Sequence, residues 1–141
     1  MTSTHPLEPR VGVGAFITDE IGRLLLVKRR RPPEADHWGL PGGKVEFGET
    51  LAESVTREIR EELGVKIVVG DLVCLVDQID SVEGTHWVAP VYRAKIVDGE
   101  PSNREPEALE AIGWFDRHNL PTPVTLATQI AVGPQARSMT T

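Results

Sequence analysis

One short stretch of the sequence, residues 43–65 with the letters GKVEFGETLAESVTREIREELGV, constrains the fold more than any other. Thr50 and Glu53 stand three residues apart, the spacing of a capping box in which the hydroxyl accepts from a backbone N–H and the carboxylate reaches back to the cap. Gly64 follows the last position of helical periodicity and tolerates the left-handed conformation that ends many helices. The sequence therefore predicts a helix over residues 51–63, of about three and a half turns.

The acidic residues of this predicted helix are not spread over its solvent side. At about 100° per residue, one stripe collects the apolar positions. They are Leu51, Ala52, Val55, Ile59 and Leu63. On the same projection Glu62 falls inside the edge of the stripe, with Glu58 and Glu61 near it. The opposite side carries Glu53 and Arg60, so three of the acids do not simply form a solvated face.

Clustered carboxylates need a positive partner. Like charges three or four residues apart on a helix repel by about 0.2–0.5 kcal/mol, and by more where water is excluded. Arg57 lies one turn before Glu61 and can neutralise that carboxylate, but it is not expected to satisfy Glu58 and Glu62 as well. Carboxylates with a deficit of positive charge suit Mg²⁺ or Mn²⁺, which makes a metal site the alternative to an ordinary charged surface helix.

The same stretch fits a longer pattern, Gx5Ex7REUxEExGU, in which U is aliphatic. Its fixed positions are Gly43, Glu49, Arg57, Glu58, Ile59, Glu61, Glu62, Gly64 and Val65. The stretch resembles the Nudix box, and the string WGLPGGKVEFGE extends the resemblance upstream. A Nudix hydrolase is implied: an α/β protein with an α/β/α sandwich and a mixed central sheet. Such enzymes cleave nucleoside diphosphates linked to another group, using Mg²⁺ (or Mn²⁺) held by the box glutamates.

The resemblance also implies roles for individual residues. The three clustered glutamates are expected to hold the metal, and the backbone carbonyl of Gly43 is a further candidate ligand. Glu58 is the preferred general base, with an acid outside the box as the alternative. Glu49 is expected to complete the outer shell or to bind another ion. Arg57 is expected to orient Glu49 or Glu61 rather than to contact the substrate.

Several candidates lie outside the box. Family members often carry a late acidic ligand upstream of the final tryptophan-containing strand, for which Glu107 and Glu110 are available and Glu110 is preferred. Arg29, or its neighbour Arg30, is expected to contact the substrate from the end of a strand, and Lys44 is a second candidate for phosphate binding. For each of these, a solvated surface position is the alternative reading.

Composition limits the kind of protein. A chain of 141 residues with 40% hydrophobic residues suits a single domain, residues 1–141, with flexible ends at 1–9 and 134–141. A net charge of −6 argues against a nucleic-acid polymer as partner but is compatible with a small nucleotide bound through metal and a few basic side chains. No apolar run is long enough to span a membrane, and the first ten residues contain no hydrophobic signal. We expect a cytoplasmic monomer or homodimer.

Apolar patterns predict the strands of the chain. They fall at residues 11–17, 23–30, 67–69, 72–76, 86–96 and 112–115. The first two are separated by a short turn and are expected to pair as a hairpin. Residues 77–84 are polar and predict a loop that borders a pocket. Cys74 lies in the apolar run LVCLV and is expected to be a buried, reduced thiol.

Four residues of the second half carry more specific expectations. Trp87 offers an aromatic surface that is expected to pack in the core, with stacking on a base as the alternative. Pro90 interrupts the same strand and predicts an edge or a bulge. Thr122 and Pro123 are expected to begin a final helix that ends near Gly133.

The substrate is less constrained than the reaction. The ending EPEALEAIGWFDRHNLP resembles MutT-like members, which hydrolyse (deoxy)nucleoside triphosphates, including oxidised guanine nucleotides, to the monophosphate and pyrophosphate. An ADP-ribose or nucleotide-sugar pyrophosphatase is the alternative enzyme. A nucleotide-binding regulatory module without turnover is the alternative outside catalysis, and the complete box argues against it.

Overall fold

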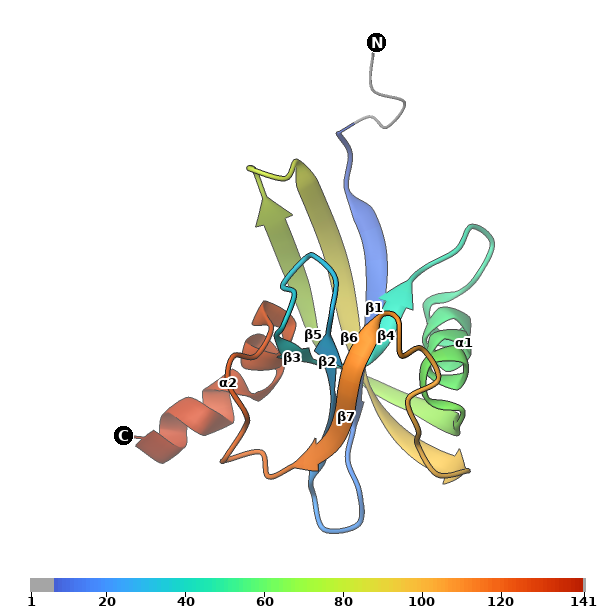
Figure 1. The fold of residues 1–141 in the computed structure, drawn as a ribbon, viewed down its shortest axis with the longest axis vertical. Coiled ribbons are helices and arrows are strands. Elements are labelled where there is room, and N and C mark those ends of the chain that lie inside the picture. Colours follow the sequence, from blue (N-terminus) through green and yellow to red (C-terminus); the bar gives the residue numbers. More distant parts are fainter. Residues whose placement is uncertain (1–6, 141) are drawn as a thin grey trace.

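Two β-sheets lie between two helices in the computed structural model (Figure 1). It describes the backbone of residues 7–140 and the side chains of residues 7–133. In chain order the elements are β1 (Arg10–Ile17), β2 (Leu24–Arg29), β3 (Trp38–Gly39), β4 (Gly42–Lys44), α1 (Leu51–Leu63), β5 (Lys66–Asp80), β6 (Thr85–Asp98), β7 (Leu109–Phe115) and α2 (Leu126–Thr140). The predicted α/β class and α/β/α sandwich are confirmed.

The larger sheet is mixed and the smaller one is antiparallel. The larger has the strand order β4-β1-β6-β5, in which β1 and β6 run parallel while the other neighbours run antiparallel. The smaller has the order β3-β2-β7. The layers between the helices are thus two sheets, with the short strands β3 and β4 next to the loop that leads into α1.

The predicted hairpin of the first two strands is wrong. A turn does connect β1 to β2, but only an isolated bridge between Thr18 and Leu24 joins them, and the strands then enter different sheets. Residues 24–27 of β2 are all buried, on both faces of the strand. A strand of this kind needs cover on both sides, which it obtains by pairing with β7 inside the sandwich.

The long hairpin of β5 and β6 differs from the prediction in two ways. β5 continues through Gly70 and on to Asp80, with register shifts taking up the irregular residues, so residues 77–80 belong to a strand and not to the predicted loop. Pro90 lies in β6, which is central rather than at an edge. Pro90 pairs with Leu75 of β5, and the register of β5 shifts close by, between Leu72 and Cys74. Of the two predicted alternatives, an edge strand or a bulge, the bulge therefore describes the site better.

Two hydrophobic clusters hold the layers together. One joins α1 to the sheets through Val55, Ile59 and Leu63, which are all fully buried, with Leu51 partly buried against them. The predicted apolar stripe is confirmed except for Ala52, which is exposed. The other lies towards α2 and includes Phe16 and Val132. Cys74 packs at the margin of the second cluster and is only partly buried, so the expectation of a fully buried thiol is wrong.

α2 begins later and continues further than predicted. Thr125, not Thr122, caps it: its Oγ1 accepts from the backbone N of Thr128 at 3.3 Å. The preceding residues are held against β3, because Trp38 N donates to Pro123 O at 2.9 Å, and this delays the helix. Its backbone extends past Gly133 to Thr140. Within the described residues, neither helix is long and apolar enough to cross a membrane.

Candidate active site

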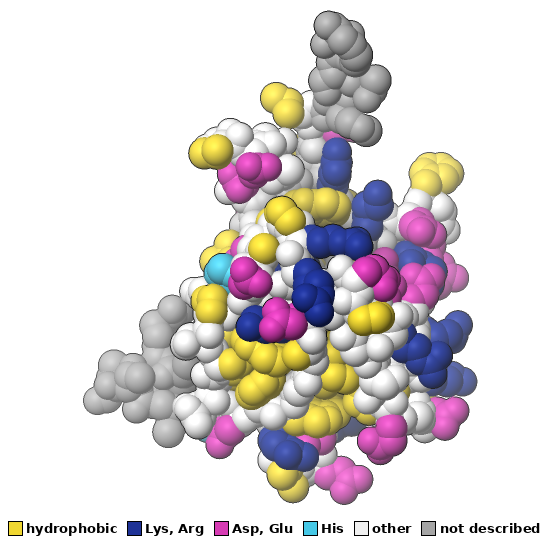
Figure 2. Space-filling model, in the orientation of Figure 1, with side chains coloured by type: hydrophobic (Ala, Val, Ile, Leu, Met, Phe, Trp, Pro, Cys, Tyr) yellow, Lys and Arg dark blue, Asp and Glu magenta, His cyan; other side chains and the backbone are white. Residues whose placement is uncertain are grey.

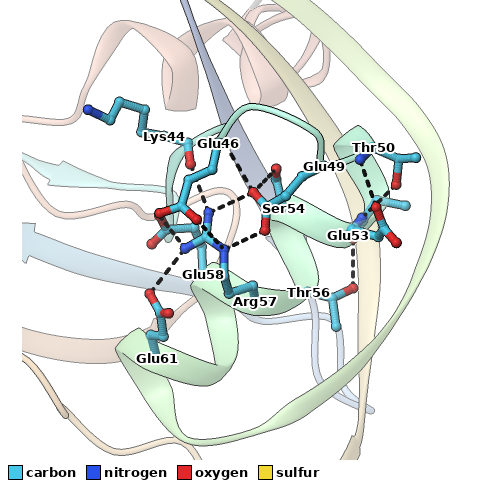
Figure 3. A network of polar contacts seen from close by, with 11 residues as sticks. Lys44, Glu46, Glu49, Thr50, Glu53, Ser54, Thr56, Arg57, Glu58 and Glu61 are labelled. Carbon is cyan, nitrogen blue, oxygen red and sulfur yellow. Dashed lines mark hydrogen bonds and ion pairs between the residues drawn. The ribbon is translucent and has the colours of Figure 1, made fainter.

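Helix α1 begins and ends where its sequence predicts. Thr50 Oγ1 accepts from Glu53 N at 3.1 Å, and Glu53 Oε1 accepts from Thr50 N at 2.8 Å, which completes the capping box. Gly64 adopts φ 73° and its N–H donates to Arg60 O at 2.9 Å. The helix therefore presents its glutamates from a fixed frame next to β4 (Figure 3).

Arg57 lies at the centre of a network of carboxylates (Figure 3). Its Nε and Nη2 donate to the two oxygens of Glu49 at 2.6 and 2.9 Å. Its Nη1 donates to Glu58 at 3.2 Å and to Glu61 at 3.1 Å, and Nη2 also donates to the Lys44 carbonyl at 3.0 Å. The expectation that Arg57 cannot also satisfy Glu58 is wrong, because the planar guanidinium fork presents five N–H donors in different directions. Glu62 is not among the acids that Arg57 contacts, as expected.

This network fixes the charge of its members. Hydrogen bonding from Arg57 is the main cause that lowers the pKa of Glu49 to about 2, and the Ser54 hydroxyl, which donates to Glu49 at 2.6 Å, is the second. Glu49 in turn is the main reason that the pKa of Arg57 is raised above its ordinary value. Arg57 and Glu49 thus form a permanently charged pair that holds the loop before α1 against the helix.

Glu62 has a different environment from the rest of the box. Its side chain is buried, and the residue is only 7% exposed. One oxygen accepts from Gly42 N at 3.1 Å, and Arg29 supplies a favourable charge without a direct ion pair. Burial is the main cause that raises the pKa of Glu62 to about 8, helped by repulsion from Glu105 and Glu58. The Glu62 carboxylate is therefore buried without a cationic partner in direct contact, which is the situation that a bound metal ion would relieve.

The two glycines before the box let the backbone approach these acids. A Cβ atom on residue 43 would overlap the carboxyl group of Glu58. β4 pairs with β1 so that Gly43 faces Val13, and the alternation of an antiparallel ladder directs the Gly43 carbonyl towards β1. The backbone of Gly42 faces the open edge of the sheet, where its N–H meets Glu62. Gly43 as a metal ligand remains a prediction.

A pocket of about 310 Å³ opens beside Glu62, between the sheets. Both residues predicted to contact the substrate, Arg29 and Lys44, line it together with Gly42 and Gly43. In the orientation of Figure 1, Lys and Arg side chains gather across the upper middle of the surface, with acids beside them (Figure 2). Glu62, one of the expected metal ligands, and basic groups suited to phosphates therefore meet at one cavity.

The loop between β2 and β3 is tied across this pocket. Arg29 Nε donates to the Pro33 carbonyl at 2.8 Å. Glu34, which also lines the pocket, accepts from the backbone N of Leu126 at 2.8 Å. Glu34 therefore joins this loop to the first turn of α2, a contact across 92 positions of sequence that no local pattern predicts.

The late acids have different surroundings, and Glu110 as a metal ligand remains a prediction. Glu110 pairs with Lys28, with 3.5 Å between Oε2 and Nζ, and Glu107 is exposed. Glu105 instead lies close enough to the box for its charge to raise the pKa of both Glu58 and Glu62. Sequence reasoning missed Glu105, although it is the first acid of the EPE string.

The donor set fits a hard divalent cation, although the side chains do not enclose one in this arrangement. Burial is the main cause that raises the pKa of Glu58 above its usual value, as it does for Glu62. Buried Glu62 and partly buried Glu58, beside exposed Glu61, provide the oxygen ligands that Mg²⁺ prefers. No group of three Asp, Glu, His or Cys side chains in the described part of the chain surrounds a common centre, and Arg57 occupies both Glu58 and Glu61.

The fold and the site together define a class of protein: a two-sheet sandwich whose glutamate-rich helix follows a glycine loop at the mouth of a pocket. The family model of the NUDIX domain matches residues 8–132. The chain belongs to the Nudix family.

Known proteins of this family resemble the chain at different levels. The crystal structure of a MutT NUDIX hydrolase from Burkholderia pseudomallei is 54% identical, covers 89% of this chain and 96% of its own, and superposes with a TM-score of 0.85. An ADP-ribose pyrophosphatase of Methanocaldococcus jannaschii is 36% identical over 82% of this chain and 66% of its own length. The 8-oxo-dGDP phosphatase NUDT18 of Mus musculus is 32% identical over 78% of this chain, which corresponds to 33% of that protein.

Proposed function

We propose that this protein is a metal-dependent hydrolase that cleaves a phosphoanhydride bond of a (deoxy)nucleoside triphosphate, giving the monophosphate and pyrophosphate. One observation carries the proposal: buried Glu62 lies at a pocket that Arg29 and Lys44 also line. A polyphosphate bound there lies between basic side chains and the acids of the box. The net charge of −6 then poses no difficulty, because the positive charge is supplied locally.

Glu58, Glu61 and Glu62 are the residues that would hold Mg²⁺ or Mn²⁺, and their oxygen donors suit such an ion. When bound, the metal neutralises phosphoryl oxygens and lowers the pKa of a water molecule. For Glu58 and Glu61 to become ligands, their oxygens must turn away from Arg57 Nη1, which lies 3.2 and 3.1 Å from them. Arg57 keeps Glu49 as its main partner during that change.

The residues of the chain divide the remaining work. Glu58 takes the proton of the attacking water, whose oxygen bonds to phosphorus as the bond to the bridging oxygen breaks. Arg29 and Lys44 bind phosphoryl oxygens. Arg57 and Glu49 position the helix and the glycine loop relative to each other.

Two observations favour a nucleoside triphosphate, including oxidised forms. The MutT structure from B. pseudomallei covers 89% of the chain with 54% identity and favours the MutT-like reaction. The mouse relative is named for 8-oxo-dGDP, which favours an oxidised guanine base but is a diphosphate. A pocket of about 310 Å³ is also near the lower end of the range for small-molecule sites, so it suits one nucleoside. A cytoplasmic location, where such nucleotides are found, goes with this proposal.

An ADP-ribose or nucleotide-sugar pyrophosphatase is the second candidate, favoured by the name of the archaeal relative. The decisive experiment incubates the purified protein with Mg²⁺ and nucleoside triphosphates, 8-oxidised nucleotides, ADP-ribose and nucleotide sugars, and identifies products by chromatography. We expect monophosphate and pyrophosphate from a triphosphate at the highest kcat/KM. Preferential release of AMP from ADP-ribose would support the second candidate. Binding of nucleotide and metal without turnover on any substrate would indicate a regulatory module.

A further inference from the structure

The larger sheet gives the pocket a floor of small residues, which begins beside Glu62, because Gly14 pairs with Gly42 and Gly42 N donates to Glu62. Gly12 and Gly14 of β1 and Ala89 of β6 form this floor. They lie on the same face of the larger sheet, since β1 and β6 run parallel in register and successive side chains alternate between faces. A Cβ on Gly14 would be 3.5 Å from Val91 and thus would fit sterically. Gly14 is therefore not needed to avoid a steric clash; its effect is to leave space in the pocket.

Trp87 borders this floor and belongs to neither hydrophobic cluster. A Cβ on Gly12 would lie 3.6 Å from Trp87 Cε3 and 3.3 Å from the Gly43 carbonyl oxygen, so residue 12 places no side chain against the indole. Arg10 Cζ lies 5.8 Å from the centre of the ring. The expectation that Trp87 packs in the core is therefore wrong, because Trp87 lines the pocket and Gly12, its diagonal neighbour on β1, has no side chain to cover it.

Gln78 stands next to Trp87 and adds polar chemistry. The two residues are direct partners across β5 and β6, and both line the pocket. The Gln78 side chain is half-buried, and within the described residues its amide has no hydrogen-bond partner. A half-buried amide offers both a donor and an acceptor, which is what the edge of a nucleobase requires.

We propose that Trp87 stacks on the nucleobase of the substrate and that Gln78 hydrogen-bonds to the edge of that base. The inference rests on the proposed function and extends it, since it assigns the part of the pocket that selects the base. With phosphates at Lys44 and Glu62, the ribose lies over Gly12 and Gly14. Phosphate binding, at β4 and α1, and base selection, at β5 and β6, are then carried by different elements.

The test compares nucleoside triphosphates of four bases with inorganic tripolyphosphate, which has the same anhydride bonds and no base. Trp87→Leu keeps apolar bulk without an aromatic face, whereas Trp87→Phe keeps a smaller one. Stacking contributions of this kind correspond to roughly a 10-fold or greater effect. We expect Trp87→Leu to raise KM for nucleotides by that factor, with kcat little changed. Trp87→Phe should bring KM for nucleotides most of the way back to the wild-type value. KM for tripolyphosphate should be the same in all three proteins.

Two further variants sharpen the comparison. Gln78→Glu keeps the shape but removes the donor, so it should change the order of preference among the bases. His86→Ala is the matched control: it is the neighbour of Trp87 on the opposite face of β6, where its Nε2 lies 3.2 Å from Asp77 Oδ1. We expect His86→Ala to behave as the wild type with all five substrates.

A binding measurement separates this inference from the proposed function. Titration of the wild type and Trp87→Leu with nucleoside monophosphates in EDTA, by calorimetry, requires no turnover. Weaker binding of the monophosphates to Trp87→Leu than to the wild type would support the base site even if no substrate were hydrolysed. The absence of hydrolysis would contradict only the proposed function. Equal nucleotide KM and equal monophosphate affinity in the wild type, Trp87→Leu and Trp87→Phe would overturn the base site while leaving hydrolysis intact.

Discussion

The carboxylate of Glu58 lies in the space that a Cβ atom on residue 43 would occupy. Glycine at this position therefore lets the Glu58 carboxylate keep its place, and any larger residue would push that carboxylate aside. The contact joins β4 to the helix at the point where the metal ligands are expected. It explains in physical terms why the glycine and the glutamate of this pattern go together.

Replacing Gly43 by alanine should displace Glu58 and disturb the site while the fold persists. A shift of about 1 Å in a catalytic group can lower the rate about 10²-fold, and we expect a loss in kcat of that order. Steady-state kinetics and thermal unfolding check both parts. Gly70→Ala is the control, since residue 70 lies on an exposed part of β5 where a Cβ would make only ordinary contacts. Full activity of Gly43→Ala would refute the role given to this contact.

Arg57 should not be replaceable by lysine. The guanidinium binds both oxygens of Glu49 and reaches Glu58 and Glu61 at the same time, which a single ammonium cannot reproduce. Arg57→Lys and Arg57→Ala should both lose activity by about 10–100-fold, the range typical of residues that orient metal ligands, with little change in KM. Arg60→Ala, on the exposed side of the same helix, should be unaffected. Wild-type kcat in Arg57→Lys would show that charge alone suffices.

The stability of the metal-free protein should fall as pH rises from about 4.5 to about 8. The pKa of Glu62 is raised to about 8 from an ordinary value of 4.5, so the folded state holds its proton more tightly than the unfolded state. The contribution of Glu62 to the free energy of unfolding is therefore fully present below the unfolded-state pKa of 4.5 and is lost as pH rises through the folded-state pKa of about 8. The slope due to one such group is at most about 1.4 kcal/mol per pH unit.

Denaturant unfolding in EDTA between pH 5 and 8, at roughly one-unit steps, measures this slope. Glu62→Gln should show a shallower decrease than the wild type, whereas Glu20→Gln, at an exposed turn, should show the wild-type slope. Glu49, whose pKa is lowered to about 2, acts in a separate and more acidic range. Parallel curves for the wild type and Glu62→Gln would contradict the burial of a destabilised carboxylate.

Glu105 should matter more than the other late acids. Its charge acts on Glu58 and Glu62, whereas Glu110 is paired with Lys28. We expect Glu105→Gln to lower activity or metal affinity by about 10–100-fold. Glu107→Gln and Glu110→Gln should remain close to the wild type in assays of turnover against Mg²⁺ concentration. If Glu110→Gln alone lost activity, Glu110 and not Glu105 would be the late metal ligand, as the sequence suggests.

The parts of this structure that follow from local interactions were predictable, and those that depend on distant partners were not. α1 was predictable because Thr50, Glu53 and Gly64 act within one or two turns. The separation of β1 from β2 was not, because each strand pairs with elements from the second half of the chain. Glu105 and Trp87 show the same limit in the site: their neighbours, the box glutamates and Gly12, are brought to them by the sandwich.

The central claim is that Glu62 holds a catalytic metal at the expense of stability, and Glu62→Gln tests it most directly. Hydrolysis of a nucleoside triphosphate with Mg²⁺ and the melting temperature in EDTA are measured on the wild type, Glu62→Gln and the exposed control Glu20→Gln. We predict that Glu62→Gln lowers kcat by about 10²-fold or more while melting at or above the wild-type temperature at pH 8. Wild-type kcat in Glu62→Gln, or a lost fold, would contradict the account.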